Sequence, residues 1–157
     1  MMTSVPERYR YAAVPHVMVD GAAEAIRFYA EAFGGEELFR IATPEGQIIH
    51  AEVAIQGSVI MVGDADGPFR APSASGGSTT GLHVYVDDVD AFSAQAVRAG
   101  AEVLQPPTDM FYGARQVMLR DPFGHLWVFL THTEDLSPEE IARRGTELFK
   151  ANAPLAD

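Results

Sequence analysis

A histidine and a glutamate two residues apart are the side chains in this sequence best placed to do chemistry. Between residues 49 and 55 every odd position is apolar. Because successive strand side chains point to opposite faces, the odd positions should face helices, and His50, Glu52, Ala54 and Gln56 should share the other face. His50 and Glu52 would then lie roughly 6 to 7 Å apart, close enough to serve one substrate, with either acting as a general base. The alternative is that both lie at a solvated or dimer-covered rim.

An internal repeat places two further histidines at equivalent positions. Residues 15–21 (PHVMVDG) resemble residues 82–88 (LHVYVDD) at an offset of 67, so that His16 corresponds to His83. Two similar units usually pair around a shared concavity, which we call the cup. Two neutral imidazoles with Glu52 could hold a divalent metal. The alternative is a pair of hydrogen-bonded histidines repeated with their unit.

The elements that must position these residues follow the order βαβββ twice. In the first unit, Ile26, Tyr29, Ala30 and Phe33 form the apolar stripe of a helix that ends at Gly34. The predicted strands of this unit span residues 13–19, 36–41, 48–55 and 58–62. In the second unit they span residues 82–86, 102–104, 115–120 and 126–130, with a helix from about residue 89 to 99 and a long Pro-rich loop over residues 106–113.

These patterns predict an α+β fold in which two βαβββ units form a curled, mixed β-sheet cup. We expect one domain over residues 1–157, with unit 1 at about 12–64, a Gly, Ser and Pro-rich linker at 65–80, and unit 2 at about 81–132. A capping box that starts at Ser137 predicts a C-terminal helix over about 138–150.

Composition excludes several classes of function. The net charge of −11 disfavours nucleic acid and anionic membrane surfaces, so the partner should be a small molecule or another protein chain. The absence of cysteine rules out disulfides, thiolate chemistry and Cys-ligated zinc. No apolar run resembles a signal peptide or a membrane span, and a cytoplasmic protein is expected.

Two motifs carry a family resemblance that covers about residues 11–132. The helix containing Ile26-Arg27-Phe28-Tyr29 ahead of Phe33-Gly34-Gly35 is one, and residues 121–127 (DPFGHLW) before an apolar strand are the other. Together with the repeated unit, they resemble the vicinal oxygen chelate superfamily of glyoxalase I, bleomycin-resistance proteins and extradiol dioxygenases. Residues 112–115 and 131–135 resemble its PhnB-like branch. The resemblance implies a homodimer, with units paired within or between chains.

The resemblance also implies where a metal would be held. Metal enzymes of the superfamily place one ligand on the first and one on the last strand of each unit, at positions that fall here on Val14, Met61, Gly81 and Val128. None of these side chains is a metal ligand. We therefore expect no metal and no other cofactor. The alternative is one divalent ion held by His16, His83 and Glu52.

Further residues are expected to contact a ligand in the cup. They are His16 and His83, the loop aromatics Phe111 and Tyr112, and Arg115, whose guanidinium could fork onto a carboxylate or phosphonate or could instead pair with an acidic side chain. Trp127 and Phe129 should pack under a helix, and His125 and His132 should be peripheral.

The sequence therefore predicts a protein that binds a small anionic or aromatic compound in the cup without the usual metal. The alternative is a metal-dependent lyase, isomerase or dioxygenase of glyoxalase type. Whether the protein is an enzyme or a sequestering protein stays open.

Overall fold

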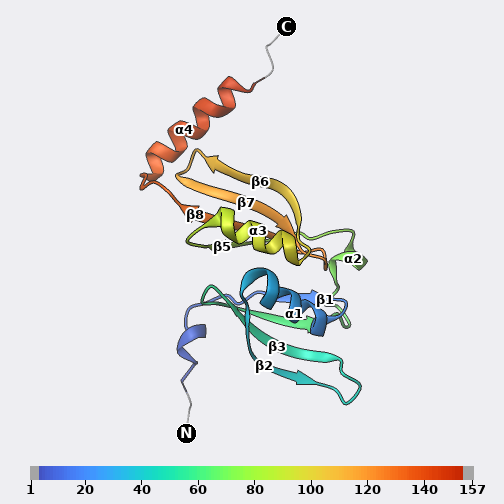
Figure 1. Ribbon diagram of the computed structural model, residues 1–157. Coiled ribbons are helices and arrows are strands. Elements are labelled where there is room, and N and C mark those ends of the chain that lie inside the picture. Colours follow the sequence, from blue (N-terminus) through green and yellow to red (C-terminus); the bar gives the residue numbers. More distant parts are fainter. Residues whose placement is uncertain (1–3, 154–157) are drawn as a thin grey trace.

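A computed structural model describes residues 4–153 and contains two four-stranded mixed sheets (Figure 1). The first unit consists of β1 (His16–Val19), α1 (Ala22–Phe33), β2 (Glu36–Ala42), β3 (Ile48–Ile55) and β4 (Ser58–Asp64). The second consists of β5 (Gly81–Tyr85), α3 (Val89–Ala99), β6 (Glu102–Met110), β7 (Ala114–Arg120) and β8 (Leu126–His132). Their strand orders, β1-β4-β3-β2 and β5-β8-β7-β6, are the same, which confirms the predicted α+β fold of two βαβββ units.

Three shorter or peripheral elements complete the chain. A single 3₁₀ turn, η1 (Glu7–Tyr9), precedes the first unit, α2 (Pro72–Ser75) lies in the linker, and α4 (Pro138–Ala151) extends away from the second unit (Figure 1). The predicted cap of α4 is present, since Ser137 Oγ accepts from the Glu140 amide at 3.2 Å. No helix among residues 4–153 is long and apolar enough to cross a membrane.

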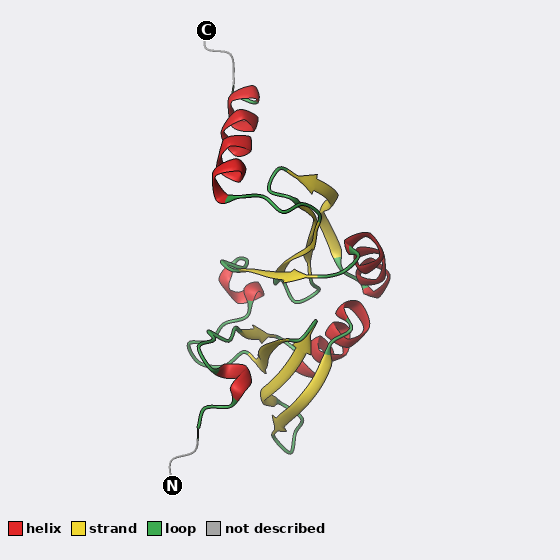
Figure 2. Cartoon of the chain, turned by 90° about the vertical axis from the view of Figure 1, so that its left-hand side faces the viewer, coloured by secondary structure: helices red, strands yellow, loops and turns green. Residues whose placement is uncertain are grey.

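Helices α1 and α3 lie side by side and cover one face of the two sheets (Figure 2). The shared core beneath them is aromatic: the Phe33 and Phe129 ring centroids lie 4.7 Å apart, and Trp127 stacks on Phe129 at 5.8 Å. Trp127 and Phe129 are fully buried, as predicted. The opposite faces of the sheets carry no helix of their own unit and are the surfaces on which a site can form.

The offset of 67 holds at the level of single atoms. Asp64 Oδ1 accepts a hydrogen bond from the Ala22 amide at 2.8 Å, and Thr131 Oγ1 accepts one from the Val89 amide at the same distance. In each unit the last strand thus caps the N-terminus of the helix with a side-chain oxygen. His16 is paired with Met61 and His83 with Val128, which are again 67 residues apart.

A buried carboxylate ties the two units together. Asp121 is only 3% exposed, and its Oδ2 accepts from the Tyr29 hydroxyl at 2.8 Å and from Trp127 Nε1 at 2.9 Å. Its Oδ1 accepts from the Phe123 and His125 amides, both at 2.9 Å. Burial and the neighbouring Asp121 raise the pKa of Tyr29 well above its ordinary value. Asp121, the first residue of the Asp-Pro-Phe-Gly motif, therefore has a structural role in the core between the units.

Four sequence expectations need correction. β1 begins at His16 rather than at residue 13, and the linker contains α2. β6 continues to Met110 where a loop was predicted, because the two prolines lie on an edge strand, where irregular pairing between Val103 and Thr108 accommodates them. Ile49 is 52% exposed instead of facing the helices, because the β2–β3 register shifts next to it.

Candidate functional site

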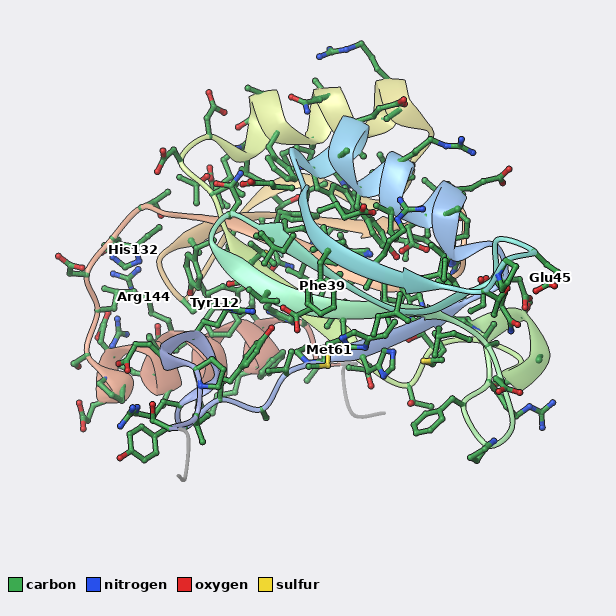
Figure 3. All side chains as sticks on the ribbon, turned by 90° about the horizontal axis from the view of Figure 1, so that it is seen from below. Phe39, Glu45, Met61, Tyr112, His132 and Arg144 are labelled. Atoms are coloured by element: carbon green, nitrogen blue, oxygen red, sulfur yellow. The ribbon has the colours of Figure 1, made fainter. Side chains whose placement is uncertain are left out.

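Four side chains form a row across the uncovered face of the first sheet. The strand registers place His16 beside Met61, Met61 beside Glu52, and Glu52 beside Phe39. The row therefore crosses β1, β4, β3 and β2 in that order, and Figure 3 shows Phe39 and Met61 along it. Ala51 and Val53, on either side of Glu52, point into the core under the helix, so Glu52 points to the opposite face.

His50 joins this row and brings a second imidazole to it. His50 Nε2 lies 3.7 Å from Glu52 Oε1, which confirms that the two side chains share a face and approach one another. The His50 ring centroid is 5.6 Å from that of His16 and 5.7 Å from that of Phe39. We call His16, His50, Glu52, Phe39 and Met61 the acidic row. It offers one carboxylate, two imidazoles and an aromatic wall within a few ångströms.

A glycine makes room for the first of these imidazoles. A Cβ at Gly63 would lie 3.2 Å from His16 Nε2 and 3.1 Å from the Ile49 carbonyl oxygen, so any larger residue would press on the ring. Partial burial, with His50 nearby, lowers the pKa of His16 below its ordinary value. His16 is therefore a neutral imidazole at pH 7, able to donate or accept a hydrogen bond.

The N-terminal turn η1 covers the carboxylate of the acidic row. Glu52 is only 4% exposed, and Arg8 Nη2 donates to its Oε2 at 3.1 Å. The Tyr9 hydroxyl is buried close enough to Glu52 to stabilise its charge, although its geometry falls short of a hydrogen bond to any described residue. Burial alone would raise the pKa of Glu52, but the nearby Tyr9 hydroxyl and Arg8 guanidinium outweigh this and hold the pKa below its ordinary value. Glu52 is thus ionised although it is buried.

Sequence reasoning missed Arg8 and Tyr9. Both residues lie in the polar N-terminal segment, which shows neither helical nor strand periodicity. The one signal was that a buried carboxylate needs a cation, which would have pointed to the arginines of this segment.

The equivalent row of the second sheet contains no carboxylate. Its members, paired across β5, β8, β7 and β6, are His83, Val128, Met118 and Gln105. We call this the amide row, because Gln116 Nε2 donates to Gln105 Oε1 at 2.9 Å while the Tyr112 hydroxyl donates to Gln116 Oε1. Tyr112, one of the predicted ligand contacts, packs on this face against Ala114, Val128 and Leu130.

The two equivalent histidines do not line the same cavity. His83 and Arg8 line a cavity of about 630 Å³ between the units, whereas His16 lines separate cavities of about 390 and 320 Å³. No group of three His, Asp or Glu side chains within residues 4–153 is arranged to hold a metal ion, so His16, His83 and Glu52 do not converge. Met61 and Val128, at two of the positions used by the family's metal enzymes, are the strand partners of His16 and His83.

Two predicted ligand contacts have structural partners instead. Arg115 makes a two-pronged contact with Asp90, with Nε to Oδ2 at 2.7 Å and Nη2 to Oδ1 at 3.0 Å, and it also bonds Asp109 at 3.1 Å. Phe111 packs against α4, where its ring lies 6.3 Å from that of Phe149. Neither side chain is directed to the acidic row.

The remaining histidines have different roles. His132 bonds Asp135 at 2.7 Å and lies with Arg144 at the end of the molecule that carries α4, a peripheral place as expected (Figure 3). His125 is partly buried, and its Nε2 lies 2.8 Å from the Met18 carbonyl oxygen, so it links the units rather than standing at the periphery.

Comparisons with known proteins agree with this architecture. Residues 11–129 match the family model of the Glyoxalase/Bleomycin resistance protein/Dioxygenase superfamily. Protein Rv0887c of Mycobacterium tuberculosis is 38% identical over 132 residues, which cover 81% of this chain and 78% of that protein. The crystal structure of TioX from Micromonospora sp. ML1 is 30% identical with a TM-score of 0.62, over 80% of this chain and 99% of TioX.

More distant structures share the fold alone. FosX, a fosfomycin resistance protein of Listeria monocytogenes, superposes with a TM-score of 0.59 at 15% identity, over 90% of this chain and 99% of FosX. From the repeated unit, the shared sheet topology and the family match over most of its length, this chain belongs to the glyoxalase/bleomycin resistance protein/dioxygenase superfamily.

Proposed function

We propose that this protein binds a small organic compound on the acidic row. The observation that carries the proposal is the buried, ionised Glu52 on the sheet face opposite α1, with His50 at 3.7 Å from Glu52 and the Phe39 ring beside His50. Convergent polar groups against aromatic and thioether walls are typical of small-molecule sites. Of the two ligand classes predicted from sequence, an aromatic compound fits better than an anionic one, because Arg115 is engaged by Asp90 and Glu52 would repel an anion.

Catalysis is the second candidate, and the His50–Glu52 contact favours it. A carboxylate held in its ionised form can orient an imidazole that takes a proton from a bound substrate. The low pKa of Glu52 makes it a weak base, so in such a reaction His50 would act as the base and Glu52 as the group that orients it. A glyoxalase-like lyase or isomerase, or a dioxygenase, is the class that this alternative implies.

We further propose that the protein works without a resident metal and as a homodimer of the PhnB-like branch. Met61 and Val128 offer no oxygen or nitrogen donor at positions where the family's metal enzymes hold their ion. Exposed apolar residues, Ile41 and Ile49 next to the acidic row and Phe149 on α4, offer surfaces that a second copy could cover. The stretches at residues 112–115 and 131–135 favour the PhnB-like assignment.

The test is a screen of neutral aromatic compounds against the ¹⁵N-labelled protein, followed by variants. We expect amide shifts to concentrate at Phe39, His50 and Glu52, and His50→Ala to weaken binding by about tenfold or less if the ring only provides contact. Arg120→Ala is the matched control, because Arg120 pairs with Glu102 on the second unit. Shifts confined to the amide row would contradict the proposal. Turnover of a bound compound that His50→Ala abolishes while affinity persists would instead establish the enzyme.

A further inference from the structure

The turn η1 places a cationic side chain of the protein itself at the carboxylate of the acidic row. Among the described residues Arg8 reaches Glu52 through one contact, Nη2 to Oε2, although a guanidinium and a carboxylate can form two parallel hydrogen bonds. The Arg8 side chain is 49% exposed whereas that of Glu52 is 6% exposed. The carboxylate therefore belongs to the folded sheet, and its cation comes from outside it.

The attachment of η1 is weak compared with the site that it covers. It is a single turn of three residues without a side-chain cap, and none of its residues is buried as a whole. Tyr11, two residues further on, is fully exposed and adopts a φ of 63°, a left-handed conformation that side chains with a Cβ disfavour. The turn is thus a strained segment without a cap, and its Arg8 side chain is joined to the acidic row by one hydrogen bond.

The groups around Glu52 suit a planar cation better than a neutral ring. Beside the carboxylate lie the buried Tyr9 hydroxyl, which lacks a hydrogen-bond partner among the described residues, and the ring of Phe39. Arg8 itself shows the mode of binding, because its guanidinium lies 4.6 Å from the centroid of the Tyr9 ring. The net charge of −11 further favours a cationic ligand over an anionic one.

We propose that Glu52 is the anchor for a planar, delocalised cation of the ligand, an amidinium or guanidinium on an aromatic body, and that Arg8 occupies this anchor when no ligand is bound. The ligand displaces the Arg8 guanidinium and takes over its hydrogen bond to Glu52 Oε2. This inference rests on the proposed function, since it names the chemical class that the acidic row binds. Because Arg8 and the ligand compete for Glu52, the apparent affinity for the ligand equals its intrinsic affinity multiplied by the fraction of molecules in which Arg8 is not bound to Glu52.

Benzamidine and its neutral analogue benzamide test the inference at constant ionic strength, with amide shifts around Glu52 as the readout. If Arg8 is bound to Glu52 in about nine molecules of ten, Arg8→Ala should tighten benzamidine binding about tenfold. The affinity for benzamide should stay almost unchanged. Arg10→Ala is the matched control, because Arg10 lies next to the same turn but pairs with the exposed Glu7. Glu52→Gln should remove the preference for benzamidine over benzamide.

The possible outcomes separate this inference from the proposed function. Equal binding of benzamide and benzamidine to the Arg8→Ala protein overturns the cation anchor while the aromatic site stands. Weaker benzamidine binding by Arg8→Ala than by Arg10→Ala also overturns it, because Arg8 would then be part of the site and not its competitor. Binding of neither compound to any variant overturns both proposals. If Glu52→Gln fails to fold, the comparison of Arg8→Ala with Arg10→Ala decides alone.

Discussion

The two units share a backbone plan and differ in the chemistry of one row. His16, Met61, Glu52 and Phe39 cross the first sheet where His83, Val128, Met118 and Gln105 cross the second. The acidic row contains a buried charge that recruits Arg8 from outside the sheet, whereas the amide row satisfies its polar groups through Gln105, Gln116 and Tyr112. The repeat therefore determines where a side chain stands, and single residues determine whether that place attracts a cation.

The largest effect on stability is expected when the side chains that cap the helices of the two units are removed. Asp64 accepts from three backbone amides, those of Gly21, Ala22 and Ile48, whereas its counterpart Thr131 accepts from the amide of Val89. Asp64→Ala should lower the free energy of unfolding by about 3 kcal/mol and Thr131→Ala by about 1 kcal/mol, because each orphaned amide adds a penalty. Urea denaturation followed by circular dichroism measures both, and equal losses would contradict this account of the caps.

A smaller effect should appear in the pH dependence of stability. The pKa of Glu52 is lowered in the folded protein from its ordinary 4.5, so its ionised form contributes stability above that value, which is lost as the pH falls through the folded pKa. The stability deficit of Glu52→Gln relative to wild type should therefore shrink between about pH 6 and about pH 3. Met118→Leu, at the matching place in the amide row, should show a deficit that does not change with pH. If the stability deficits of both variants changed with pH in the same way, the electrostatic difference between the two rows would be contradicted.

The smallest effect on stability is expected at α4, which follows the second unit and has no counterpart in the first. Only the second unit continues into α4, where Phe149 is 68% exposed. Phe149→Asp should change the unfolding free energy of the chain by about 0.5 kcal/mol or less, yet shift the light-scattering mass from dimer toward monomer. Lys150→Ala on the same helix is the control and should keep the dimer. A monomeric wild type at working concentration would contradict the dimer outright.

The fold could be predicted from sequence to the extent that it depends on period and repetition. The offset of 67, the helical stripe from Ile26 to Phe33 and the alternation in β3 determine the layers. Prediction failed where the pattern is interrupted: Pro106 and Pro107 resemble a loop, although an edge strand accepts prolines. The exposure of Ile49 depends on a register shift against β2, which no single strand can reveal.

The site was predictable only in its local part. Alternation along β3 places His50 and Glu52 on one face without knowledge of any other element. The partners of these residues depend on contacts that are distant in sequence, since Arg8 is 44 residues from Glu52 and Asp90 is 25 residues from Arg115. Arg115 could bind a ligand or an acidic side chain by its chemistry alone, and only the position of α3 decides between them.

The hydrogen bonds of Asp121 have a consequence for how the molecule unfolds. Its carboxylate joins Tyr29 on α1 to Trp127 on β8, so separating the units would break the hydrogen bond from Tyr29 and expose the aromatic core that the two units share. We therefore expect the two units to unfold together rather than independently. The turn η1, which contributes no residue to this shared core, is outside the part of the fold that Asp121 holds together.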